Sequence, residues 1–112
     1  YRGPVSLKHA GVAAGLGKIG RNTLLINDRL GSMLWLGAAL TAAVLEADAP
    51  AAYEVCSPNC RMCADNCPAG AIGGEMMNQM ACLNHAFKWQ DGHVRISCWK
   101  CRTLCPHRFG IN

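Results

Sequence analysis

The chain has 112 residues, of which 16% are charged and 51% hydrophobic, and its formal net charge is +4. This composition suits one compact domain and excludes an intrinsically disordered chain. The longest apolar stretch, Met33 to Leu45, is too short for a membrane span. No signal peptide follows Tyr1, and we expect the chain to be a piece of a longer protein. With 8 Cys and 12 Gly, the fold is expected to need disulfides, metal ions or metal clusters.

The first third of the chain is predicted to contain a short helix and a short strand. Pro4 is suited to a helix start, so a helix is expected over Val5 to Ala14, ended by Gly15. The branched residues of Thr23 to Ile26 favour a strand, and residues 27–32 favour a turn.

The middle of the chain is ambiguous. The Ala and Leu content of Ser32 to Ala47 favours a helix, whereas Met33 to Leu36 also fits a buried strand. Residues 48–52 are predicted to form a loop, which would precede the cysteine-rich part.

Two elements are predicted between the last cysteines. Gln79 to Trp89 has helical periodicity, and Asp91-Gly92 is a strong tight-turn signal. His93 to Ile96 then alternates as a strand does.

All of the cysteines lie in the second half of the chain, in two runs. The runs are Cys56-x3-Cys60-x2-Cys63-x3-Cys67-Pro68 and Cys98-x2-Cys101-x3-Cys105-Pro106, with Cys82 between them. Both end in C-x2-C-x3-C-P, which is an internal repeat. This spacing is typical of chains that hold two [4Fe–4S] clusters, because neighbouring thiolates bind one cluster and the Cys before Pro binds the other.

This rule assigns every cysteine to one of two groups. The first predicted group is Cys56, Cys60, Cys63 and Cys105, and the second is Cys67, Cys82, Cys98 and Cys101. The first gap of the first run is one residue longer than usual. The prediction for Cys56 therefore requires the turn at Ser57-Pro58-Asn59 to accommodate that residue.

Two other uses of the cysteines are open at this point. They could form two zinc sites of four thiolates each, or a disulfide scaffold of the kind found in small secreted domains. The formal charge also depends on this choice, because the thiolates of two clusters would cancel the +4. The net charge therefore does not decide whether nucleic acid is a partner.

The segment Gly15-x-Gly17-x-x-Gly20 matches the G-x-G-x-x-G pattern of dinucleotide-binding loops. A helix is predicted before it where that fold has a strand, and no acidic ribose partner stands about 20 residues further on. The alternative is a tight turn in which glycine permits positive φ.

The stretch from Lys8 to Asn27, KHAGVAAGLGKIGRNTLLIN, resembles the AGLGxxGKNxLLI segment of the epoxyqueuosine reductase family, whose relatives include the corrinoid reductive dehalogenases. Gly31-Ser32 and the whole cysteine pattern, isolated Cys82 included, are also similar. The resemblance implies a C-terminal double [4Fe–4S] ferredoxin-like module that relays electrons to a cobalamin held largely by an upstream domain. It also implies a strand over Met33 to Leu40.

The resemblance further implies that the glycine segment lies beside the corrinoid. The cofactor-binding residues would then be Gly15, Gly17, Gly20 and Asn22. The family carries an Asp and a Glu around a Pro-Val pair, and Tyr1 and Leu7 stand at the matching positions here. The resemblance therefore assigns no catalytic proton donor to this chain.

Together these observations predict an α+β fold, a small ferredoxin-like double-cluster domain with short helices and few short strands. Residues 1–55 would be the end of a cobalamin-associated reductase domain, and residues 56–112 the cluster-binding module. The predicted function is electron transfer from a donor protein or reductase within an oxidoreductase. A ferredoxin-like carrier or subunit without a catalytic site and a zinc-stabilised binding module are the alternatives. Free thiolates require a reducing compartment, so the cytoplasm is expected.

Overall fold

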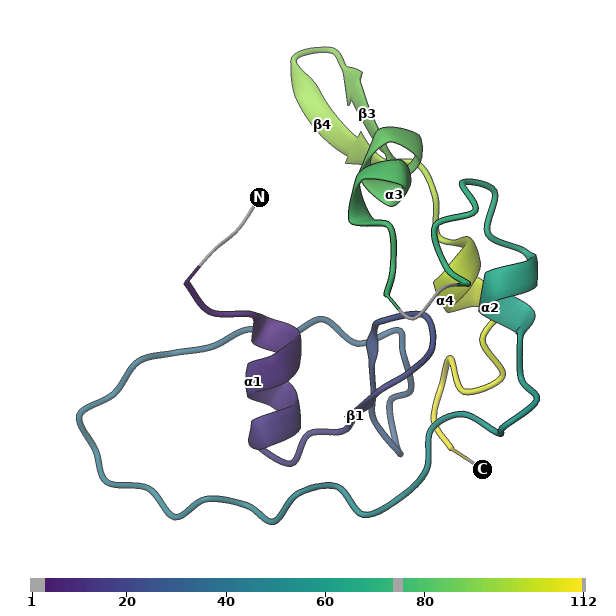
Figure 1. Cartoon of the computed structure of the whole chain (residues 1–112). Helices are drawn as coiled ribbons and strands as arrows, with labels where there is room; N and C mark the ends of the chain where they lie inside the picture. Colours follow the sequence, from purple (N-terminus) through teal and green to yellow (C-terminus); the bar gives the residue numbers. More distant parts are fainter. Residues whose placement is uncertain (1–3, 74–75, 112) are drawn as a thin grey trace.

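The computed structural model describes residues 4–73 and 76–111 (Figure 1), so Tyr1 lies outside the described residues. Within them the fold is mixed α and β, as predicted, and contains four short helices and two antiparallel two-stranded sheets. In chain order the elements are α1 (Leu7–Ala13), β1 (Lys18–Ile19), β2 (Leu25–Ile26), α2 (Met62–Asp65), α3 (Gln79–Ala86), β3 (Phe87–Gln90), β4 (His93–Ile96) and α4 (Lys100–Thr103). No helix in these residues has the length and apolarity of a membrane span.

The glycine segment leads from a helix into a small antiparallel sheet. Helix α1 is the predicted N-terminal helix, and it begins after Ser6 rather than at Pro4. Strands β1 and β2 pair with Ile19 opposite Leu25. Gly15 has φ of 72°, and a Cβ there would collide with the carbonyl oxygen of Ala49. The motif is therefore a tight turn followed by an antiparallel pair, which differs from the βαβ setting of a dinucleotide loop.

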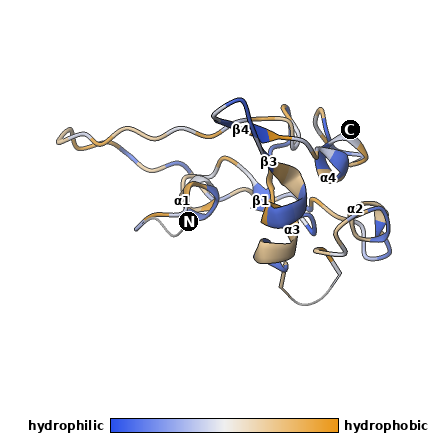
Figure 2. Ribbon diagram, turned by 90° about the horizontal axis from the view of Figure 1, so that it is seen from above, coloured by the Kyte–Doolittle hydropathy of each residue, from blue (hydrophilic) through white to orange (hydrophobic). Residues whose placement is uncertain are grey.

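The segment between β2 and α2 has neither helix nor strand over residues 33–61. The predicted helix over Ser32 to Ala47 was therefore wrong. The predicted strand, whether over Met33 to Leu36 or over Met33 to Leu40, was also wrong. The middle of this segment projects away from the rest of the chain (Figures 1 and 2), and residues 37–50 are all exposed, Leu40 and Val44 fully. Apolar residues stabilise a helix or strand chiefly by packing one face, and those of residues 37–50 have no surface to pack on. The loop predicted over residues 48–52 is confirmed.

The hydrophobic core is small and includes cysteine. Ile26, Val55 and Cys105 are buried together, and Tyr53 and Ile111 pack against them. The core thus draws residues from both sides of the predicted boundary between residues 55 and 56. Such a small apolar core contributes little to the stability of a folded chain of this length. The fold is therefore consistent with an added stabilising group.

The predicted helix over Gln79 to Trp89 is shorter than expected. It ends at Ala86, and the next four residues form β3, which pairs with β4. The turn is made by Asp91 with φ of 51° and Gly92 with φ of 76°. Two positive φ values are those of a type I′ turn, which matches the twist of paired strands. The predicted turn and the strand at His93 to Ile96 are confirmed.

Candidate metal centre

The repeat in the two cysteine runs is also a repeat in the backbone. Each run contains a four-residue helix that begins one residue before the second cysteine of its C-x2-C pair. Helix α2 begins one residue before Cys63, and α4 begins one residue before Cys101. The residues that precede the helices match closely, since Arg61 has φ −124° and ψ 10° and Trp99 has φ −126° and ψ 8°. The two helices pack against each other. The short turns present Cys63 and Cys101 from neighbouring elements.

The first predicted group of cysteines lines one cavity. Cys56, Cys60, Cys63 and Cys105 all face it. Burial raises the pKa of Cys63, and the neighbouring Cys56, Cys60 and Cys105 raise it further. Burial likewise raises the pKa of Cys105. Cys105 comes from the second run, so the structure brings it to the three cysteines of the first run.

The second predicted group also lies together. Burial raises the pKa of Cys101, and so do the nearby thiols of Cys82 and Cys98. Burial and then Cys67 and Cys98 raise the pKa of Cys82. Isolated Cys82, carried on α3, thus joins cysteines from both runs. Cys63 also contributes to raising the pKa of Cys101, and α2 packs against α4, so the two groups are neighbours.

The donor set suits a group larger than one metal ion. All eight cysteines are free thiols. Around a single zinc the sulfur atoms would lie about 4 Å apart, because each Zn–S bond is about 2.3 Å long. Within residues 4–73 and 76–111, no three Cys, His, Asp or Glu side chains are placed to hold one ion. Four thiolates that face one cavity suit a polynuclear iron–sulfur group, which takes one thiolate at each of its four iron atoms.

Backbone N–H groups donate to a sulfur atom in each group. The Arg21 N–H lies 3.4 Å from Cys56 Sγ, and the Ala71 N–H lies 3.3 Å from Cys67 Sγ. Such donors stabilise the negative charge of thiolates that bind a cluster.

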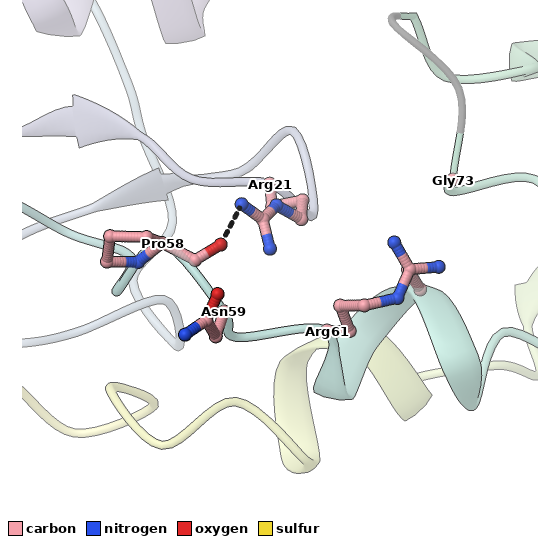
Figure 3. Close-up of a pocket in the computed structure, with 6 residues that line it drawn as sticks. Arg21, Pro58, Asn59, Arg61 and Gly73 are labelled. Atoms are coloured by element: carbon pink, nitrogen blue, oxygen red, sulfur yellow. Dashed lines mark hydrogen bonds between the residues drawn. The ribbon is translucent and has the colours of Figure 1, made fainter.

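Arg21 also supports the backbone between Cys56 and Cys60, which is the longer gap of the first run. Its guanidinium donates to the carbonyl oxygen of Pro58 at 3.1 Å (Figure 3). It also donates to the carbonyl oxygen of Cys60. The fork of the guanidinium suits two acceptors at once. The turn that contains the additional residue is therefore tied to the N-terminal part of the chain, next to Cys56.

Asn22 performs the corresponding role for the second run. Its side chain is only 3% exposed. Nδ2 donates to the carbonyl oxygen of Cys101 at 3.1 Å, and Oδ1 accepts from the Leu24 N–H at 3.2 Å. Gly17 and Gly20 lie close to Ile26, where a Cβ would collide. Binding of a corrinoid by Gly15, Gly17, Gly20 and Asn22 stays a prediction, and the contacts shown here are with the cysteine runs.

Sequence reasoning missed Arg21 and Asn22 as supports of the cysteine loops, and it missed Ser32. The only available signal was that all three stand in the segments that resemble the reductase family. Arg102 adds a further contact, since its guanidinium donates to the carbonyl oxygens of Ser32 and Leu34. It also lies 5.3 Å from the ring centroid of Trp35.

Ser32 carries an unpaired polar atom at the first group. The residue is fully buried, and its hydroxyl oxygen has no hydrogen-bond partner among the described residues. The hydroxyl nevertheless lies near enough to Cys105 to lower the pKa of that thiol, against the larger opposite effect of burial. An unsatisfied buried hydroxyl costs about 1–3 kcal/mol. A thiolate or sulfide acceptor in the cavity would satisfy it, so the residues present fit an iron–sulfur group.

If the first group of cysteines holds an iron–sulfur cluster, we expect Ser32→Ala to lower the reduction potential of that cluster by roughly 30–60 mV, about the effect of one hydrogen bond of 1 kcal/mol on a one-electron couple. The hydroxyl stabilises the more negative reduced form, so its loss disfavours reduction. A redox titration followed by electron paramagnetic resonance measures the shift. Ser32→Thr keeps the hydroxyl and should keep the potential. Equal potentials in the wild type and Ser32→Ala would show that the hydroxyl does not reach the cluster.

Comparison with known proteins finds several epoxyqueuosine reductases among the relatives of this chain. The chain is 32% identical to the epoxyqueuosine reductase of Staphylococcus aureus strain NCTC 8325, over 88% of this chain and 28% of the relative. It is 35% identical to the enzyme of Listeria monocytogenes, over 87% of this chain and 28% of the relative. The enzyme of Gloeobacter violaceus is 36% identical, over 93% of this chain and 36% of the relative.

The chain thus spans about a third of the length of these curated relatives. No family model and no solved structure matches it. These relatives match between 87% and 93% of this chain. By this similarity, the chain belongs to the epoxyqueuosine reductase-like family and corresponds to part of those enzymes.

Proposed function

We propose that this chain is an electron-transfer module that holds two [4Fe–4S] clusters within an epoxyqueuosine reductase-like oxidoreductase. The observation that carries the proposal is the sorting of eight cysteines into two groups of four, each drawn from both runs. A disulfide scaffold would instead pair the cysteines, and all eight are free.

Each group has its own ligands in the proposal. The first cluster is held by Cys56, Cys60, Cys63 and Cys105, and the second by Cys67, Cys82, Cys98 and Cys101. When bound, such clusters supply one-electron redox chemistry. The chain's own residues place the two groups side by side through the contact of α2 with α4. They also limit access of water, because Met62 and Pro106 line the first cavity beside its cysteines.

The proposed fold is a ferredoxin-like double-cluster module over residues 56–112. Residues 1–55 form the end of a cobalamin-associated reductase domain in this proposal. They also support the module, since Arg21, Asn22 and Ser32 all contact or face the cysteine runs. Electrons would enter from a donor protein and leave towards a cobalamin held by an upstream domain. The free cysteines suit a reducing compartment, which we propose to be the cytoplasm.

Iron analysis and bleaching test the proposal. Anaerobic reconstitution with iron and sulfide should give about eight iron and eight sulfide per chain, which is the content of two cubane clusters. The product should be brown, and dithionite should bleach it. A zinc-stabilised binding module would instead hold about two zinc ions per chain and show no bleaching. That second outcome would overturn the proposal.

Added cobalamin separates the proposed module from a carrier that has no catalytic partner. The full-length protein to which the module belongs should bind cobalamin, and the bound corrinoid should be reduced when the clusters are. A full-length protein that carries reduced clusters but neither binds nor reduces cobalamin would be a ferredoxin-like carrier or subunit.

A further inference from the structure

The β3–β4 hairpin is exposed on both of its faces. All eight residues of the two strands are exposed, and α3 is the neighbouring element that contacts β3. In Figure 1 the hairpin stands at the end of α3, away from the β1–β2 sheet. An isolated two-stranded hairpin is at best marginally stable in water, so such an exposed one is expected to gain from a partner.

The pairing register separates apolar from cationic side chains. Phe87 pairs with Ile96 and Trp89 pairs with Val94, so four large apolar residues share one face. Their exposed fractions are 41%, 36%, 75% and 56% respectively. An exposed aromatic residue among aliphatic ones is typical of the centre of a protein–protein interface.

The opposite face carries an uncompensated pair of cations. Lys88 stands directly across from Arg95, and Gln90 stands across from His93. Like charges at opposed positions destabilise a hairpin. The one acidic residue of the hairpin, Asp91, is in the turn, and α3 contains no acidic residue. Among the described residues, neither Lys88 nor Arg95 forms a salt bridge, so both cations are available to an acidic partner.

The base of the hairpin is joined to the second group of cysteines at both ends. Helix α3, which precedes β3, contains Cys82, and Cys98 follows β4 after one intervening residue. That residue, Ser97, closes the base, because its N–H and its hydroxyl both donate to the carbonyl oxygen of Ala86, at 2.7 Å and 3.1 Å. A protein bound on the hairpin would therefore lie beside Cys82 and Cys98.

We propose that the β3–β4 hairpin is the docking surface for an acidic one-electron carrier protein, a flavodoxin or a ferredoxin. This inference rests on the proposed function. One electron leaves the reduced carrier and enters the cluster held by Cys67, Cys82, Cys98 and Cys101, and no bond is formed or broken. The apolar face, with Trp89 at its centre, is the face that contacts the carrier. The charges of Lys88 and Arg95, on the other face, attract the acidic carrier over a distance and without direct contact. Carrier encounters of this kind are small and strongly dependent on electrostatic attraction.

Stopped-flow reduction of the reconstituted chain by reduced flavodoxin tests the inference. We expect the double variant Lys88→Glu/Arg95→Glu to lower the second-order rate constant at least tenfold at low ionic strength, and added salt to remove most of this difference. Trp89→Ala should lower the rate at high and low salt alike. Arg29→Glu is the matched control, because Arg29 is exposed in a turn outside the hairpin, and its rate should stay within twofold of the wild type.

Reduction by dithionite separates this inference from the proposed function. If dithionite bleaches wild type and variants equally while flavodoxin reduces them at equal rates, the docking surface is refuted and the cluster module stands. If no bleachable clusters form in the wild type, the proposed function itself fails. Binding of double-stranded RNA that depends on Lys88 and Arg95, with unchanged reduction by flavodoxin, would assign the cationic face to nucleic acid instead and overturn the inference.

Discussion

Cys105→Ala is expected to halve the iron content of the reconstituted chain, from about eight to about four per chain, and to remove one of the two cluster signals in electron paramagnetic resonance. Cys105 is both a proposed ligand and a member of the small core, where it is 9% exposed. Its loss leaves three thiolates around the first cavity. The remaining cluster should be the one held with Cys82.

Double variants test whether the ligands cross between the two runs. Cys63→Ala/Cys105→Ala combines one residue from each run but affects one proposed cluster, so it should lose no more iron than either single variant. Cys82→Ala/Cys105→Ala affects both proposed clusters and should lose nearly all of the iron. Such non-additivity identifies residues that act on one site. Full iron loss in the first pair and half loss in the second would refute the crossed assignment.

Asn22→Ala is expected to destabilise the reconstituted chain by about 2–4 kcal/mol, because it leaves two backbone groups without partners. These groups are the carbonyl of Cys101 and the N–H of Leu24, which the buried amide satisfies at 3.1 Å and 3.2 Å. Anaerobic urea unfolding, followed by cluster absorbance and circular dichroism, measures the change. The second cluster should be released first, because Cys101 lies in its group.

Two further substitutions control for the role of the Asn22 amide. Asn59→Ala removes an exposed amide that makes no described side-chain hydrogen bond, and it should change stability by less than about 0.5 kcal/mol. Asn22→Asp keeps the acceptor for Leu24 and loses the donor for Cys101, so it should also destabilise the chain. If Asn22→Ala unfolded at the same urea concentration as the wild type, Asn22 would not be a support of the second run.

Local signals predicted the parts of the fold that depend on local physics. The Asp91-Gly92 turn requires two positive φ values, and few residue pairs adopt them, so the hairpin could be located from those two residues. The start of α1 was predicted two residues too early, at Val5 instead of Leu7, because Ser6 rather than Pro4 precedes the helix. The end of α3 was predicted too late, because Phe87 to Trp89 fits a helix face but gains more by pairing with β4.

The segment over residues 33–61 shows where propensity was insufficient. Ala and Leu favour a helix only slightly, and the gain from burying an apolar face normally decides. Leu40 and Val44 are exposed, so neither the helix nor the strand obtains that gain. The roles of Arg21 and Asn22 were also beyond the sequence, because their partners at Cys60 and Cys101 are distant along the chain.

By itself, the sequence predicted the chemistry that we propose for this protein: the spacing of its cysteines, the repeated C-x2-C-x3-C-P turn and the resemblance to a reductase family are all local patterns. The cysteine spacing also predicted that Cys105 joins Cys56, Cys60 and Cys63, and the structure places these four at one cavity. Only the tertiary structure decided that Arg21, Asn22 and Ser32 support the two groups. The physical reason is that the spacing of the cysteines depends on short backbone turns between residues that are close in the sequence. Burial and hydrogen bonding between distant segments arise only once the chain has folded.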